Sequence, residues 1–227
     1  MNQEQIGTQE LKMDRESRIT AYIHSLDQGH GPLCDRIARE ARAAGVPIIR
    51  RETAAFLQTM VAAVRPGRIL EVGTAVGYSA LLMAQVMPEG CHITTIEKYE
   101  PRIAQAREHF RLAGAEDAVT LIAGDADQVL EQLSGTFDFI FMDAAKGQYL
   151  HWLPRILELL PEGGVLLTDN VLQDGDVVES RFAVERRNRT IHARMREYLY
   201  VLTHSEDLQT SIIPIGDGVA LSVKRER

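Results

Sequence analysis

Short apolar runs alternate with helix-like stretches through most of the chain, and this alternation limits its possible folds more than any other feature. The runs expected to form strands are residues 68–72, 92–96, 119–122, 137–142 and 165–168. Strands in a parallel sheet that is covered on both faces are apolar along their length, and helices connect them. The pattern therefore predicts an α/β fold with a mostly parallel sheet and helices on both faces.

Three helices are predicted before the first strand, over residues 14–26, 33–44 and 51–64, with stop signals at Gly45 and Pro66. We interpret residues 1–66 as an N-terminal helical part and residues 67–227 as the core of the same single domain. A chain of 227 residues buries enough surface to fold without disulfides or a structural metal.

The rest of the chain adds three helices and a hairpin to this pattern. Helix signals cover residues 100–113 and 149–160, where Pro154 is expected to kink the helix or to begin its last part. A long polar helix is predicted over residues 179–203. Two further strands, residues 208–215 and 219–224, flank a Gly-Asp-Gly turn, which predicts an antiparallel hairpin at one edge of a seven-stranded sheet.

Composition excludes several classes of protein. Cys34 and Cys91 are far apart and form no CxxC, so neither a disulfide framework nor a zinc site is indicated, and both are interpreted as small buried hydrophobic residues. No apolar run approaches the roughly 18 residues of a membrane span. We therefore expect a cytoplasmic protein that does not enter a membrane. The formal charge of -7 argues against a uniformly basic surface.

Acidic residues follow the first three predicted strands, where ligands bind in open parallel sheets. The first strand runs into Glu-Val-Gly-Thr-Ala-Val-Gly-Tyr-Ser at 71–79, which lacks the GxGxxG pattern of a pyrophosphate site. Glu97 closes the second strand, where a carboxylate can accept both hydroxyls of a ribose, and Asp125 can reach an adenine. A nucleoside without a pyrophosphate that carries an ammonium and a sulfonium suits this acidic site, and S-adenosylmethionine (SAM) has that chemistry. Alternatively, such acids are helix caps or solvated turn residues.

The next two strand ends carry Asp143 and Lys146, and then Asp169 and Asn170. Oxygen ligands favour a hard cation such as Mg²⁺, Mn²⁺ or Ca²⁺. A turn or helix cap is the alternative for Asp169 and Asn170 alone.

Together these motifs carry a family resemblance. ExGTxxGxS, Glu97, GDA, DAAKGQY and TDN follow one another as they do in the cation-dependent O-methyltransferases. The chain resembles this group, which includes catechol and caffeoyl-CoA methyltransferases, over residues 46–224. It looks most similar to a bacterial branch, the tRNA 5-hydroxyuridine methyltransferases, at residues 46–49, 169–172 and 209–218. Arg50-Arg51-Glu52 departs from the neutral or Pro-Glu sequence of many relatives, at the expected substrate mouth.

The resemblance implies a Rossmann-like SAM-methyltransferase fold, a homodimer and a set of site residues. By this likeness a metal is held by Asp143, Asp169 and Asn170. The methyl donor is contacted by Ile49, Glu71, Gly73, Ser79, Glu97, Asp125, Ala126 and Asp143.

A mechanism follows as a hypothesis. The metal would chelate two adjacent substrate oxygens and lower the pKa of the reacting hydroxyl. Asp143, as a metal ligand, and Lys146, as proton acceptor or oxyanion-stabilising charge, are the predicted catalytic residues. Alternatively, Lys146 is a plain ion-pair partner of a neighbouring acid.

An arginine-rich segment, residues 181–196, contains six arginines and one acid. Arg181, Arg186, Arg187 and Arg189 are predicted to hold phosphates of a tRNA anticodon loop, so that 5-hydroxyuridine is methylated to 5-methoxyuridine. The alternatives are a solvated helix, methylation of small catechol-like phenols at the same site, or a noncatalytic donor- or RNA-binding module. Trp152, Tyr149 and Phe182 are interpreted as core or interface residues rather than stacking platforms.

Overall fold

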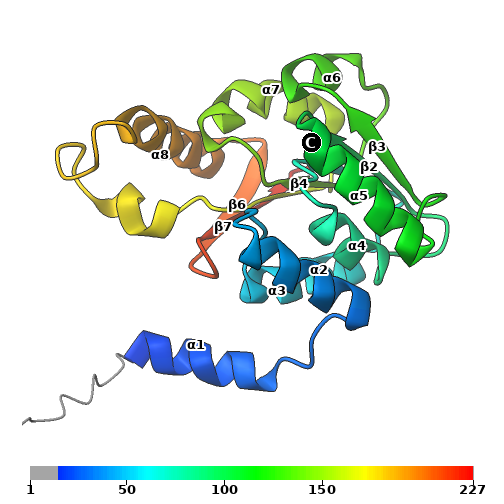
Figure 1. The fold of residues 1–227 in the computed structure, drawn as a ribbon. Helices are drawn as coiled ribbons and strands as arrows, with labels where there is room; N and C mark the ends of the chain where they lie inside the picture. Colours follow the sequence, from blue (N-terminus) through cyan, green and yellow to red (C-terminus); the bar gives the residue numbers. More distant parts are fainter. Residues whose placement is uncertain (1–14, 227) are drawn as a thin grey trace, which may run out of the picture.

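A seven-stranded sheet forms the centre of the structure, which is a computed structural model that describes residues 15–226 (Figure 1). Its strand order is β3-β2-β1-β4-β5-β7-β6. Strands β1 to β5 are parallel, whereas β7 is antiparallel to β5 and β6 is antiparallel to β7. The strands are β1 (Arg68–Val72), β2 (His92–Glu97), β3 (Val119–Ala123), β4 (Phe139–Met142), β5 (Val165–Thr168), β6 (Leu208–Ile213) and β7 (Val219–Lys224). The predicted sheet with its antiparallel edge hairpin is confirmed.

Helices cover both faces of the sheet, as Figure 1 shows. They are α1 (Arg15–Leu26), α2 (Pro32–Ala43), α3 (Arg51–Val64), α4 (Tyr78–Ala84), α5 (Glu100–Ala113), α6 (Ala126–Gln132), α7 (Tyr149–Leu159) and α8 (Arg189–His204). Two short 3₁₀ helices, η1 (Lys146–Gln148) and η2 (Gln173–Val178), follow β4 and β5.

Alternation along the strands builds a separate apolar core on each face. Ile69 and Phe139 lie in the core beneath α2 to α5, whereas their neighbours Leu70 and Ile140 lie in the core beneath α6 to α8. Successive side chains of a strand point to opposite faces, so an apolar strand supplies both cores. This explains why the central strands are continuous apolar runs.

The predicted helix over residues 179–203 is wrong in its first part, because α8 begins only at Arg189. Residues 180–188 form turns, in which the amide of Ala183 donates to the backbone oxygen of Ser180 at 2.9 Å. Val184 is the buried side chain of this stretch. A stretch with one apolar anchor has no apolar stripe to hold it as a helix.

Other boundaries differ little from those predicted. Strand β6 ends at Ile213, just before Pro214, which cannot donate a ladder hydrogen bond. Helix α7 is a single helix with Pro154 inside it, within the predicted range of residues 149–160. The predicted start of the first helix at residue 14, like the rest of residues 1–14, lies outside the described residues. Cys34 and Cys91 are buried free thiols, as expected.

Helix α1 extends away from the rest of the molecule in Figure 1. Its C-terminal end is tied to α3 by the ring of His24, 2.6 Å from the Glu52 carboxylate, and by Asp27, 2.8 Å from the Arg51 guanidinium. None of the helices within residues 15–226 has both the length and the apolarity that crossing a membrane requires.

Candidate active site

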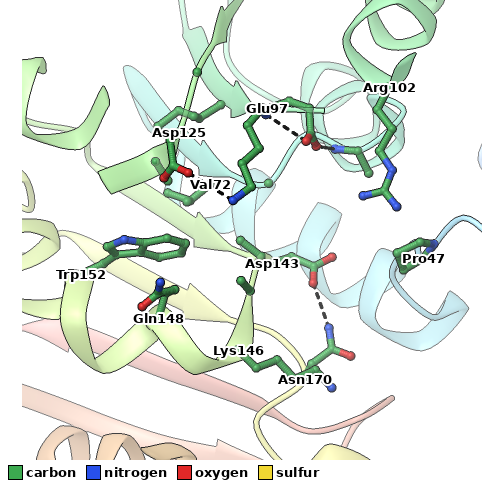
Figure 2. Close-up of a pocket in the computed structure, with 18 residues that line it drawn as sticks. Pro47, Val72, Glu97, Arg102, Asp125, Asp143, Lys146, Gln148, Trp152 and Asn170 are labelled. Atoms are coloured by element: carbon green, nitrogen blue, oxygen red, sulfur yellow. Dashed lines mark hydrogen bonds and ion pairs between the residues drawn. The ribbon is translucent and has the colours of Figure 1, made fainter. Parts of the chain in front are cut away.

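A cavity of about 530 Å³ opens at the carboxyl ends of the parallel strands (Figure 2). Seven predicted site residues line it, and they come from the ends of β1 to β5: Gly73, Glu97, Asp125, Ala126, Asp143, Lys146 and Asn170. Figure 2 shows Glu97 and Asp125 toward one end, Asn170 toward the other, and Asp143 between them. The topology therefore assembles in one place residues that are up to 97 positions apart.

The turn after β1 requires glycine at its first position. Gly73 has a φ of 108°, and a Cβ atom there would lie 2.1 Å from the backbone oxygen of Asp143. The ends of β1 and β4 therefore approach each other closely, which brings the turn after β1 next to Asp143. Any side chain at Gly73 would separate them.

The Glu97 carboxylate is fixed by three backbone amides. Ala75 donates to Oε2 at 2.9 Å, and Lys98 and Tyr99 donate to Oε1 at 3.0 and 2.9 Å. The side chain lies almost fully buried at the cavity wall. A carboxylate held in this way can still accept from ligand hydroxyls, because each oxygen has two lone pairs. The arrangement fits the ribose of a nucleoside.

Asp125 caps α6 and faces the same end of the cavity. It accepts from the backbone amide of Asp127 at 3.1 Å and from Lys98 Nζ at 3.1 Å. The Asp127 amide and then the Lys98 ammonium hold the pKa of Asp125 below its usual range. Trp152 is nearly buried and also lines the cavity, and its indole nitrogen donates to Asp127. Trp152 is thus both a core and a cavity residue, whereas the exposed Phe182 lies outside the core.

Two carboxylates and an amide meet at the ends of β4 and β5. Asn170 Nδ2 donates to Asp143 Oδ1 at 2.9 Å. Asp169 is buried, and its Oδ1 has no hydrogen-bond partner among residues 15–226. Burial raises the pKa of both aspartates, and at Asp169 the nearby Asp143 raises it further.

This donor set fits a hard divalent cation. A buried carboxylate oxygen without a partner is costly unless a cation or a proton compensates for it. The described residues contain no group of three or more His, Cys, Asp or Glu side chains arranged for a metal. Here the third side chain is the Asn170 amide, so the set is two acids and one neutral oxygen donor, as Mg²⁺ prefers.

Lys146 reaches the cavity from η1, directly after the DAA sequence that follows β4. Its Nζ lies 3.0 Å from Asp217 Oδ2 in the β6–β7 turn. The loop before it is held by Tyr149, whose hydroxyl accepts from the amide of Ala144 at 3.1 Å. An ammonium is thereby placed beside the predicted metal ligands.

Four of the predicted contact residues do not line the cavity. Ile49, Ser79 and Asp169 are buried, and Glu71 is fully buried in β1, where it accepts from the Thr95 hydroxyl. Burial raises the pKa of Glu71 to about 7.

Eleven residues that line the cavity were absent from the predicted site, among them Pro47, Lys98, Arg102 and Gln148. Lys98 directly follows Glu97, and Gln148 belongs to the DAAKGQY motif. Their nearness in sequence to predicted site residues could have identified both as cavity residues. Arg102 lies in the first turn of α5, and its guanidinium packs 5.5 Å from the centre of the Tyr99 ring.

Comparison with known proteins agrees with this geometry. The family described as O-methyltransferase matches residues 36–225. The chain belongs to this O-methyltransferase family. A caffeoyl-CoA O-methyltransferase of Populus kitakamiensis is 32% identical over 172 residues, which cover 73% of each protein. A catechol O-methyltransferase of Niastella koreensis is 36% identical over 129 residues, which cover 55% of this chain and 58% of that protein.

Solved structures extend the likeness to the whole chain. An SAH-bound methyltransferase of Podospora anserina superposes with a TM-score of 0.84 at 25% identity and covers 100% of both chains. SAH is the product that SAM leaves after methyl transfer. The chain is therefore a SAM-dependent O-methyltransferase with the SAM-methyltransferase fold.

Proposed function

We propose that this enzyme methylates one of two adjacent oxygens on a small catechol-like acceptor, with a divalent cation held by Asp143, Asp169 and Asn170. The observation that carries the proposal is a buried Asp169 oxygen, beside the Asp143–Asn170 pair, that has no hydrogen-bond partner in the described part of the chain. The similarity to catechol and caffeoyl-CoA O-methyltransferases supports the acceptor class. Two adjacent oxygens suit the site because a six-coordinate cation with three protein ligands keeps three open positions, of which a chelating acceptor fills two and water the third.

Positioning and deprotonation are the tasks of the protein in this reaction. The cation, when bound, supplies positive charge that lowers the pKa of a chelated hydroxyl. Glu97 and Asp125 bind the nucleoside part of the donor, and this directs the methyl group toward Asp143. Lys146 stabilises the oxyanion as an ammonium, or accepts the hydroxyl proton when it is a neutral amine, because its side chain ends beside the predicted ligands.

Methylation of 5-hydroxyuridine in tRNA is the second candidate. Its 5-hydroxyl lies beside the O4 carbonyl, so it offers the same two-oxygen arrangement as a catechol. The observation in its favour is that Arg181, Arg186 and Arg187 are exposed in the turns before α8. Exposed arginines can contact phosphates.

Three of the six arginines in residues 181–196 bind backbone oxygens of the protein itself, which weakens this candidate. Arg189 donates to the backbone oxygens of Phe182 and Val184, at 3.3 and 3.2 Å. Arg194 donates to Gly147 at 2.9 Å and Arg196 donates to Val177 at 3.0 Å. These three arginines fasten α8 to the loops around the site, so we assign them to structure.

The deciding experiment offers both acceptors to the protein with SAM and Mg²⁺, and mass spectrometry detects the products. Small phenols with vicinal hydroxyls, their single-hydroxyl analogues and tRNA bearing 5-hydroxyuridine are compared, each with and without EDTA. We expect EDTA-sensitive methylation of vicinal diols and none of the single-hydroxyl analogues. Methylation of tRNA alone would replace the first candidate by the second, and EDTA-resistant turnover would contradict the metal site.

The homodimer expected from the resemblance stays a prediction. Light scattering during size-exclusion chromatography should give about twice the chain mass of 25.3 kDa. A mass equal to one chain would contradict it.

A further inference from the structure

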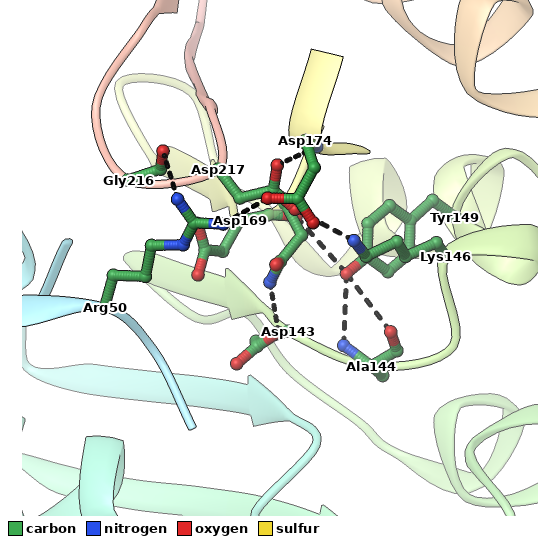
Figure 3. A network of polar contacts seen from close by, with 10 residues as sticks. Arg50, Asp143, Ala144, Lys146, Tyr149, Asp169, Asp174, Gly216 and Asp217 are labelled. Carbon is green, nitrogen blue, oxygen red and sulfur yellow. Dashed lines mark hydrogen bonds and ion pairs between the residues drawn. The ribbon is translucent and has the colours of Figure 1, made fainter. Parts of the chain in front are cut away.

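The turn between β6 and β7 lies against the active site although it is far from it in sequence (Figure 3). The amide of Val171 donates to the Gly218 oxygen at 3.0 Å, and the amide of Leu172 donates to the Asp217 oxygen at 2.9 Å. Gly218 has a φ of 80°, and a Cβ atom there would meet the Leu172 side chain at 2.2 Å. The turn is therefore closely fitted to the loop that follows Asn170.

Asp217 joins two parts of the site through one carboxylate. Its Oδ1 accepts from the backbone amide of Asp174, and its Oδ2 accepts from Lys146 Nζ at 3.0 Å. The Asp217 side chain is only 4% exposed, whereas that of Lys146 is 31% exposed and reaches the cavity. Figure 3 shows Lys146 pointing toward the Asp217 carboxylate, with Asp174 also beside that carboxylate.

Burial of Asp217 makes this contact different from a surface ion pair. The Lys98–Asp125 pair at the donor end has side chains that are 67% and 41% exposed, and pairs of that kind are weakened by solvent and salt. A carboxylate that is closed off from water and anchored by a backbone amide offers a fixed position for a flexible lysine chain. Without such a partner, the four-carbon stem of lysine samples many rotamers.

We propose that Asp217 is a positioning residue that holds the Lys146 ammonium at the end of the cavity near Asn170, where the proposed methyl acceptor binds. The inference rests on the proposed function, in which Lys146 acts on the acceptor hydroxyl. Asp217 lies behind Lys146 and acts through it. Losing the contact should lower the turnover rate more than it lowers donor binding, because a displaced ammonium no longer stabilises the oxyanion that develops in the transition state.

Asp217→Asn separates this role from loop anchoring. The Asn carbonyl can still accept from the Asp174 amide, but the NH₂ group that replaces Oδ2 cannot accept from an ammonium. The matched control is Asp138→Asn. Asp138 also accepts backbone amides, those of Gly67 and Arg68 at 2.8 and 2.9 Å, but at the start of β1, away from the cavity. Thermal unfolding of both variants shows whether each folds.

Kinetics test the positioning role with a catechol as acceptor. We expect Asp217→Asn to lower kcat by about 10- to 100-fold, with KM for SAM unchanged and Asp138→Asn without effect. In a Lys146→Met background the same substitution should cost nothing more, because the two residues act as one unit. Overturning results are an unchanged kcat, or an equal further loss in the Lys146→Met background, which would make Asp217 a structural residue.

A second measurement does not depend on the acceptor. The protein is treated with an amine-acetylating reagent, and mass spectrometry follows each lysine. Acetylation of Lys146 should accelerate severalfold in Asp217→Asn, while Lys98, which lines the same cavity, keeps its rate. An unchanged Lys146 rate overturns the proposal. If the wild-type enzyme methylates no vicinal diol, the proposed function fails. The ratio of the Lys146 acetylation rate in Asp217→Asn to that in the wild type then decides alone whether Asp217 holds Lys146.

Discussion

Asn170 donates its side-chain amide to Asp143 at 2.9 Å and so joins the end of β5 to the end of β4. The two strands are neighbours and parallel, which brings residues that are 27 positions apart into contact. Asp169 lies beside this pair with a buried oxygen that has no partner among residues 15–226. The three side chains thus offer oxygen atoms that the rest of the described chain leaves available to bind a cation.

Asp169→Ala is expected to abolish metal-dependent turnover, with a loss on the order of 100-fold or more. The substitution removes a predicted ligand, whereas the donor contacts at Glu97 and Asp125 remain. Mn²⁺ binding followed by electron paramagnetic resonance should be lost, and SAM affinity measured by calorimetry should be retained. Asp117→Ala, at an exposed position, serves as the control. Wild-type turnover or Mn²⁺ affinity in Asp169→Ala would refute the metal site.

Glu97→Gln is expected to weaken SAM binding by about 10- to 100-fold, which corresponds to about 1.5–3 kcal/mol for hydrogen bonds to a charged group. A glutamine has one accepting oxygen, so its NH₂ group must face either the ribose or one of the backbone amides that now donate to Glu97. Calorimetric titration with SAM measures the change. Glu100→Gln, at the exposed start of α5, should bind SAM as the wild type does. Equal affinities in the two variants would exclude Glu97 from the donor site.

Much of the fold was predictable because the central strands serve two cores. A strand such as β4, Phe-Ile-Phe-Met, is buried at every position, and its apolar run has no polar interruption. The succession of parallel strands β1 to β5 then placed Glu97, Asp125, Asp143 and Asn170 together at the carboxyl ends of the strands. The α8 boundary was not predictable from polarity, because arginines suit a helix surface and an exposed turn equally well.

Side-chain direction limited the prediction of the site. Glu71 is the last residue but one of β1 and Glu97 is the last residue of β2, but the Glu71 side chain is buried in the interior whereas Glu97 lines the cavity. The role of Asp217 was hidden for another reason. A Gly-Asp-Gly sequence indicates a turn, and only the packing of the β6–β7 hairpin against β5 shows that its acid meets Lys146.

Glu71→Gln should stabilise the ligand-free protein at pH 8 relative to the wild type. Burial raises the pKa of Glu71 from its usual 4.5 to about 7. The folded state therefore holds the proton more tightly than the unfolded chain, and wild-type stability falls as pH rises from 4.5 through 7. The full difference is on the order of 3 kcal/mol.

Urea unfolding of both proteins at pH 5 and pH 8 measures this effect for Glu71. Other titrating groups are common to wild type and variant, so they cancel in the difference between the two. Glu89→Gln, at an exposed position, should show no pH-dependent difference. A gap between wild type and Glu71→Gln that does not widen toward pH 8 would show that Glu71 is not protonated in the folded state near neutrality.

Charge reversal at Arg186 and Arg187 separates the two acceptor classes. Both side chains are exposed, and Arg187 pairs with Glu185 at 2.7 Å, so neither fastens a backbone segment as Arg189 does. For a catechol-like acceptor, we expect Arg186→Glu/Arg187→Glu to keep its kcat/KM. If tRNA is the substrate, the double variant should bind it more weakly and with a smaller salt dependence, because fewer counterions are released.

The matched control for this test is Arg36→Glu/Arg107→Glu, which changes the net charge equally at exposed positions on α2 and α5. Filter binding of tRNA from about 50 to 200 mM salt spans the range over which phosphate contacts lose most of their affinity. Equal binding curves for the two double variants would assign any tRNA affinity to overall charge. A smaller salt slope in Arg186→Glu/Arg187→Glu alone would instead place phosphates beside the turns that precede α8, and with them the second candidate function.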